Sequence, residues 1–215
     1  MKMNYLPLVR SLFTVGLVGC AIALPAQNLT TFRAQPNASK MTLDGSSSVH
    51  DWTVKSEVVG GAMELDSAFV TEPQKASPGK INAKANVRVP VSSLHGNRKG
   101  MDTFMYETMK LKDHKNIEYR LSELTLKEAP QSADGPFQFE SKGELTIAGV
   151  TNKISMPVTM TREEKTKMKT TGSISLKMTS FGMKPPSPPL LGSLIKTGDD
   201  VKLTFEWLTA AVAAK

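Results

Sequence analysis

Apolar and polar residues alternate with a period of two along most of the sequence from Lys40 onward. This pattern is typical of strands with one buried face and one face in water. The longest such stretches are 81–89, 137–147, 153–160, 173–178 and 201–207. Shorter stretches at 40–44, 52–59, 62–71 and 117–127 raise the expected number of strands to eight or nine. Because the strands follow one another closely, we expect antiparallel neighbours in an all-β sandwich or barrel.

One segment between the strands has a helical period instead. Apolar residues fall there at i, i+3, i+4 and i+8, which places them on one face of a helix: Met101, Phe104, Met105 and Met109. We therefore predict a single helix between strands 79–90 and 117–127. Its apolar stripe either caps one end of the barrel or lines a ligand site.

The N-terminal residues 1–27 are typical of an export signal. Lys2 and Arg10 precede a short apolar core that Pro25 interrupts, and this core is too short to span a bilayer. Cys20, the only cysteine of the chain, follows Leu17-Val18-Gly19 as in a bacterial lipobox, so it is a candidate for lipidation. The alternative is cleavage after Ala26. Either way we expect an exported protein, periplasmic or anchored as a lipoprotein, with a polar tether at 28–38 and a tail at 209–215.

Composition and motifs argue against several classes of function. The net charge is +7 with the basic residues interspersed, which fits mild attraction to an anionic membrane surface better than nucleic-acid binding. The three histidines, His50, His95 and His114, lack the spacing of metal ligands. The sequence also lacks a glycine-rich phosphate loop leading into a helix. We therefore expect no catalysis, no metal and no cofactor.

Several separated motifs resemble the YceI-like family of exported bacterial proteins. They are Ser48-Val49-His50-Asp51-Trp52, Met101-Asp102-Thr103-Phe104-Met105, the stretch from Gly143 to Thr151, and Thr179-Ser180-Phe181-Gly182-Met183-Lys184. The resemblance covers residues 39–208. It implies an eight-stranded antiparallel lipocalin-like β-barrel with one helix, whose interior binds polyisoprenoids, quinones or related amphiphilic lipids. The proline-rich loop at Pro185–Pro189 departs from the family pattern, and its role stays open.

The residues agree with a hollow barrel on independent grounds. A barrel of about eight strands has room for side chains or for one small ligand. The inward set includes small residues at Ala83, Ala85, Ser141 and Gly143, and the 12 methionines can adapt to a ligand of variable shape. The alternative is a barrel packed solid, acting as a structural or partner-binding module. A homodimer is compatible with either interpretation.

These arguments select two groups of candidate site residues. The first group is expected to contact the lipid and comprises Trp52, Val87, Met101, Phe104, Met105, Met109, Phe139, Ile147, Ile174 and Phe181. The second group is basic and surrounds the predicted helix: Arg98, Lys99 and Lys110. Its members either form a solvated surface or contact an anionic head group at the mouth of the barrel.

Overall fold

The structure is a computed structural model that describes residue 1 and residues 28–96, 100–187, 189–190 and 193–212. The predicted export segment with Cys20, and the basic residues Arg98 and Lys99, lie outside the described residues. Within the described ranges the chain forms a closed, antiparallel, eight-stranded β-barrel, which confirms the predicted fold.

The barrel is an up-and-down meander in which some positions are occupied by two strands in series. Three positions are divided in this way: β1 (Leu29–Ala34) with β2 (Lys40–Ser47), β3 (Trp52–Ser56) with β4 (Gly60–Asp66), and β6 (Ala83–Pro90) with β7 (His95–Gly96). The remaining positions are β8 (Asn116–Leu126), β9 (Phe137–Ile147), β10 (Val150–Glu164), β11 (Lys167–Lys177) and β14 (Thr197–Ala211). β14 pairs with β2 along one part of its length and with β1 near its end, and the latter pairing closes the barrel.

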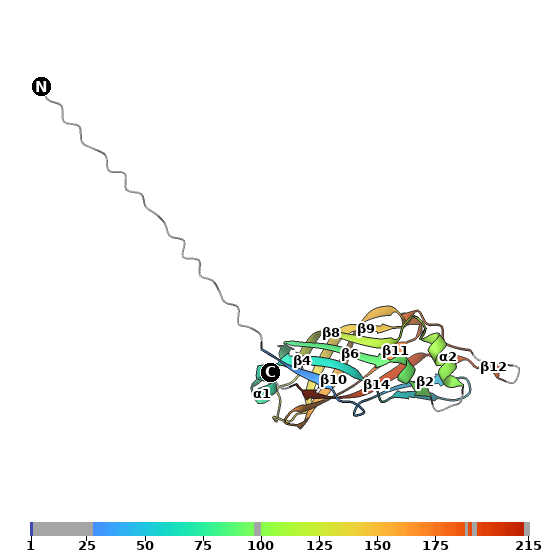
Figure 1. Cartoon of the computed structure of the whole chain (residues 1–215), viewed down its shortest axis with the longest axis horizontal. Helices are drawn as coiled ribbons and strands as arrows, with labels where there is room; N and C mark the ends of the chain where they lie inside the picture. The colour runs from blue at the N-terminus through green and yellow to red at the C-terminus, as the bar shows by residue number, and fades with distance from the viewer. Residues whose placement is uncertain (2–27, 97–99, 188, 191–192, 213–215) are drawn as a thin grey trace.

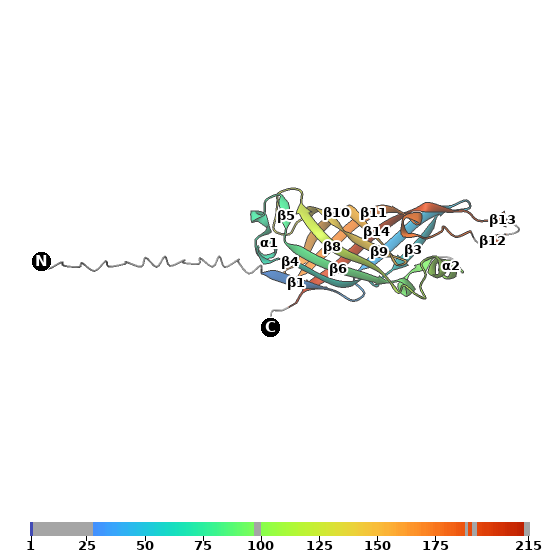
Figure 2. The same cartoon turned by 90° about the horizontal axis from the view of Figure 1, so that it is seen from above.

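Short elements lie at the two ends of the barrel. Helix α1 (Ser67–Thr71) and the C-terminal end of β14 lie at one end, whereas helix α2 (Met101–Thr108) and the hairpin of β12 (Pro189–Leu190) and β13 (Ser193–Leu194) lie at the other (Figures 1 and 2). Three 3₁₀ turns are η1 (Pro73–Lys75), η2 (Val91–Ser93) and η3 (Thr179–Phe181), and β5 (Gly79–Ile81) pairs with β8. We call the α1 end the closed end and the α2 end the open end.

The interior at the closed end is filled with side chains. Phe69 of α1 meets Phe137 and Phe139 of β9 edge to face, and its ring centroid lies 5.3 and 5.6 Å from theirs. All three rings are buried, and so are the apolar residues Phe32, Met63, Leu65, Leu126, Met160 and Met168. α1 begins there because the Asp66 carboxylate accepts hydrogen bonds from the backbone of Ala68 and Phe69. Dense packing of this kind leaves no room for a ligand.

Three sequence predictions about the chain ends and helices are wrong. The segment 28–38 is not a tether, because residues 29–34 form β1, pair with β4 and β14, and bury Phe32. The strand expected at 62–71 ends at Asp66 and is followed by α1, so the described residues hold two α-helices rather than one. The predicted tail at 209–215 begins inside β14, where Thr209 is fully buried.

Candidate ligand-binding site

The open half of the barrel contains two cavities with apolar walls. The larger has a volume of about 340 Å³ and lies under α2, within the range typical of ligand sites. The smaller, of about 70 Å³, lies next to it, and Ile117 of β8 lines both. Phe104 of α2 lines the larger cavity and is itself 40% exposed, so the cavity reaches the molecular surface at this point.

The two cavities follow one another along the barrel axis. Residues on the same face of a strand are two apart, and on several strands consecutive inward residues line first the larger and then the smaller cavity. The pairs are Leu43 and Met41 on β2, Ile117 and Tyr119 on β8, Ile147 and Leu145 on β9, and Leu176 and Ile174 on β11. On β14, Val201 lines the larger cavity, and Leu203, Phe205 and Trp207 line the smaller one. The smaller cavity is therefore the inner end of the same lumen.

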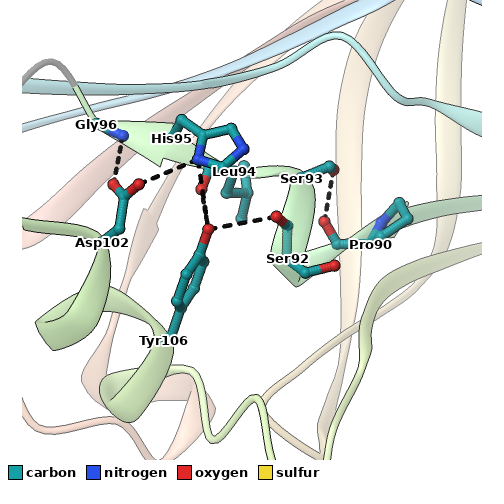
Figure 3. A network of polar contacts seen from close by, with 8 residues as sticks. All are labelled: Pro90, Ser92, Ser93, Leu94, His95, Gly96, Asp102 and Tyr106. Carbon is teal, nitrogen blue, oxygen red and sulfur yellow. Dashed lines mark hydrogen bonds and ion pairs between the residues drawn. The ribbon is translucent and has the colours of Figure 1, made fainter.

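Helix α2 covers the open end, and its apolar stripe faces the cavity. Met101, Phe104, Met105, Thr108 and Met109 all line the larger cavity, which is the helical face predicted from the sequence. A network of polar contacts holds the helix against the segment before it (Figure 3). Asp102 Oδ1 accepts a hydrogen bond from the Gly96 backbone at 2.7 Å, and Asp102 Oδ2 lies 3.0 Å from His95 Nδ1. Tyr106 donates its hydroxyl hydrogen to the Leu94 carbonyl oxygen at 2.8 Å.

The charge on Asp102 makes this attachment sensitive to pH. The hydrogen bond from Gly96 is the largest cause that holds the pKa of Asp102 below its ordinary value of 3.8, and His95 acts in the same direction. Because folding lowers the pKa of this carboxyl, its ionised form stabilises the contact at pH values above the ordinary pKa. This stabilisation is lost as the pH falls through the lowered pKa. The helix should therefore detach more readily in acid.

We expect opening of α2, measured by amide hydrogen exchange corrected for the intrinsic rate, to increase as the pH falls below about 4. The control is Asp102→Asn, which keeps an oxygen for the Gly96 amide but carries no charge, so its opening should not depend on pH in that range. Identical pH curves for the two proteins would show that Asp102 does not hold the helix.

Part of the wall of the larger cavity is formed by a tryptophan whose ring lies over a glycine of the neighbouring strand. Trp52 on β3 pairs with Gly45 on β2, and a Cβ atom at Gly45 would come within 2.1 Å of the indole ring. Glycine is therefore required for this close approach. The Trp52 indole donates a hydrogen bond to the Ser46 carbonyl oxygen at 3.0 Å, which fixes the ring at the mouth. His50 is the only ionisable side chain described in the lining of the larger cavity, and its Nδ1 lies 2.8 Å from the Asp51 carbonyl oxygen.

The structure places most of the predicted contact residues around the lumen. Those lining the larger cavity are Trp52, Met101, Phe104, Met105, Met109, Ile147 and Phe181, and those lining the smaller one are Val87 and Ile174. Phe139 lines neither, because it packs against Phe69 in the closed half and is 1% exposed. The sequence prediction for Phe139 is therefore corrected. Lys110 is exposed just after α2 and lines neither cavity.

The small inward residues do not all leave empty space, as the sequence suggested. The ring of Tyr119 occupies the place of a side chain at Gly143, where a Cβ atom would lie 2.5 Å from the Tyr119 hydroxyl. This hydroxyl is 2.7 Å from Ser141 Oγ. Burial raises the pKa of Tyr119, so the phenol stays protonated and uncharged. The residues around Gly143 therefore form a polar contact near the inner cavity rather than additional volume.

Sequence reasoning missed several lining residues. The apolar ones are Leu43, Val54, Ile117, Leu176, Met178, Met183, Ile195 and Val201 around the larger cavity. The period-two pattern assigns many of them to the inward face, but it does not say which inward residues lie beside a cavity. Tyr119 and Trp207 at the smaller cavity were missed for the same reason.

Other kinds of site find no support in the part of the chain that the structure describes. There, no group of three or more His, Cys, Asp or Glu side chains is placed to hold a metal ion. None of the helices in the described ranges is both long and apolar enough to cross a bilayer.

Comparison with known proteins gives the family. The YceI-like domain profile matches residues 32–208, and no curated protein matches the chain. The structure is similar to BcnA of Burkholderia cenocepacia, with a TM-score of 0.56 and 16% identity over 81% of this chain and 98% of that one. A polyisoprenoid binding domain from Saccharophagus degradans gives a TM-score of 0.62 with 13% identity, over 86% of this chain and all (100%) of that one. A YCEI protein from Campylobacter jejuni gives 0.51 with 14% identity, over 95% and 100%.

At these identities the solved structures establish the fold alone, and the profile match, which covers most of the chain, establishes the family. The match extends the resemblance seen in the sequence to residue 32, inside β1. The chain belongs to the YceI-like family.

Proposed function

We propose that this protein is a non-catalytic binding protein that holds an amphiphilic lipid, such as an isoprenoid, a quinone or a fatty lipid, in the open half of its barrel. The observation that carries the proposal is the cavity of about 340 Å³ under α2, whose walls are almost entirely apolar. Each ligand CH₂ group buried there contributes about 0.8 kcal/mol, so a hydrocarbon chain can bind with little polar recognition. The family and the polyisoprenoid-binding neighbour support the same ligand class.

The alternative of a barrel packed solid fits only the closed half. Phe69, Phe137 and Phe139 fill that end, whereas the walls of the larger cavity surround free space. The filled closed half limits how much of a ligand can enter, because the lumen ends where the aromatic packing begins. A long chain would therefore leave its outer part at the mouth, beside α2. Binding there fits a protein that is exported and takes lipid from a membrane surface, as residues 1–27 and Cys20 suggest.

Native mass spectrometry of protein purified from its host without organic solvent tests this function. We expect an adduct with the mass of a lipid, which organic extraction removes. We also expect the extracted protein to unfold at a lower temperature, because a ligand that binds only the folded state stabilises it. An apo mass in the native sample, together with no shift in unfolding temperature when isoprenoids, quinones or fatty lipids are added back, would contradict the proposal.

A further inference from the structure

The smaller cavity ends beside aromatic side chains of β8 and β14. Tyr119, Phe205 and Trp207 all line it. Trp207 is the last residue of β14 to do so, because the next inward residue, Thr209, is fully buried in the closed half. The inner end of the lumen therefore lies against these three rings.

Phe205 fills a space that a glycine leaves on the neighbouring strand. It pairs with Gly172 on β11, which pairs in turn with Val158 on β10. A Cβ atom at Gly172 would lie 2.8 Å from the Phe205 ring and 3.1 Å from Val158 Cγ1. Val158 is buried and lines neither cavity. The Phe205 ring therefore occupies the space through which the lumen would otherwise continue past Gly172.

Tyr119 fills the space at Gly143 on β9 in the same way. Its hydroxyl lies 2.7 Å from Oγ of Ser141, the next inward residue of β9 toward the closed end, and Ser141 is buried. Tyr119 and Phe205 are themselves only half-buried, and both line the cavity. A ligand at the inner end would therefore contact the two rings and would not reach the residues behind them.

The two cavities differ in their polar side chains, and this difference indicates the orientation of a ligand. Side chains with a hydroxyl or imidazole group line the larger cavity: Ser47, His50, Thr108 and Thr197. At the smaller cavity the Tyr119 hydroxyl already contacts Ser141, and the Trp207 indole nitrogen is enclosed by the protein. Burying a polar head group without a hydrogen-bond partner is costly. The head group should therefore stay in the larger cavity, and the hydrocarbon tail should point inward.

The depth of the lumen can be estimated along β14. Val201 lines the larger cavity and Trp207 the smaller one, and these residues are roughly 20 Å apart along the strand. Strands of such a barrel tilt by about 40° from its axis, so the depth along the axis is roughly 15 Å. An extended hydrocarbon chain advances roughly 1.3 Å per carbon, because its C–C bonds of about 1.5 Å form a zigzag. A tail of about 12 carbons therefore spans the lumen.

Taking lipid binding in the lumen as given, we propose that Tyr119, Phe205 and Trp207 limit the length of the tail that the barrel encloses. An eight-stranded barrel has room for one small ligand, so one tail enters at a time. The ligand class is then a single-tailed amphiphile, inserted tail first, whose tail is about 12 carbons long. Further carbons stay at the mouth beside α2 and add nothing to the affinity.

The test uses octaethylene glycol monoalkyl ethers with tails from octyl to hexadecyl, whose uncharged head group is too large to enter. Affinity is measured by displacement of a fluorescent probe, below the critical micelle concentration of each ether. We expect the affinity of the wild-type protein to rise about fourfold with each added CH₂ group. The rise should stop near the dodecyl ether, and this break in the series measures the enclosed length.

Two variants should move the break in opposite directions. Phe205→Ala opens the space over Gly172, so the break should move to a tail several carbons longer. Ile174→Phe places a ring in the smaller cavity, which Ile174 lines, so the break should move to a shorter tail. This variant fills free space, so its result does not depend on whether Phe205→Ala folds. The matched control is Phe104→Ala, which removes the same ring at the mouth and should leave the break unchanged.

The outcomes separate this inference from lipid binding itself. An affinity that keeps rising about fourfold per CH₂ group through the hexadecyl ether would overturn the inference and leave lipid binding intact. A break that stays in place in both Phe205→Ala and Ile174→Phe, or that moves equally in Phe104→Ala, would do the same. If the wild-type protein binds none of the ethers, the proposed function fails together with the inference.

Discussion

Replacing Ile117 by phenylalanine is expected to weaken lipid binding at least about tenfold without unfolding the barrel. Ile117 lines both cavities, so a larger side chain at this position projects into the passage between them. The ligand then loses the part of its chain that lies beyond residue 117, and each displaced CH₂ group costs about 0.8 kcal/mol. Loss of two such groups weakens binding at least about tenfold. Because free space accepts the ring, the free energy of unfolding should change by less than about 1 kcal/mol.

The matched control makes a similar enlargement in the closed half. Val158 on β10 is buried, pairs with Phe139 on β9 and lines neither of the two cavities. Val158→Phe should lower the free energy of unfolding by about 1–3 kcal/mol because the core there is already filled. Its lipid affinity should be unchanged. Isothermal titration and urea unfolding of the two variants measure these opposite effects, and a large loss of stability in Ile117→Phe would contradict a hollow open half.

Truncating Phe139 to alanine is expected to give the largest loss of stability among these variants. Phe139 is 1% exposed and contacts Phe69, so its removal leaves a cavity among rigid aromatic neighbours. Large-to-small changes of this kind cost about 3–5 kcal/mol. Leu176→Ala is the comparison, because Leu176 is half-buried beside the larger cavity and its removal only widens existing space.

Denaturant unfolding together with lipid titration separates the two roles. We expect Phe139→Ala to lose stability and to keep its ligand affinity under conditions where it is folded. Leu176→Ala should lose affinity more than stability. If Phe139→Ala instead loses affinity with little change in stability, Phe139 contacts the ligand, and the boundary between the two halves lies nearer the closed end.

The strands and their buried faces could be predicted from the sequence because the physical rule is local. In β9, inward and outward residues alternate from Phe137 to Ile147 as the period of two requires. The apolar stripe of α2 is equally local, since it depends only on the helical period. Elements with no such period were missed. β1 contains only Leu29 and Phe32 as large apolar residues, and it is held by pairing with β4 and β14, which lie far along the chain.

Which part of the lumen is empty could not be predicted from the same pattern. Phe139 and Ile147 both face inward on β9. Phe139 nevertheless packs against Phe69, whereas Ile147 lines the larger cavity. The difference arises because α1 inserts a ring at one end, and that insertion depends on tertiary structure. The prediction that Gly143 leaves free space in the lumen was wrong for a similar reason, because Tyr119 from the neighbouring strand fills that space. The period of two assigns a side chain to the inward or the outward face of its strand. Whether an inward side chain lies beside a cavity depends on residues that are distant in the sequence.

Nuclear Overhauser effects between an unlabelled bound lipid and the methyl groups of the labelled protein test the half-hollow barrel most directly. We predict contacts from the lipid to the methyls of Met105, Ile117 and Leu203, in order from the mouth to the inner cavity. We predict none to Leu65 or Met168, which are buried in the closed half. Contacts that reach Leu65 and Met168, or that involve only exposed methyls outside the barrel, would contradict a lipid held in the open half.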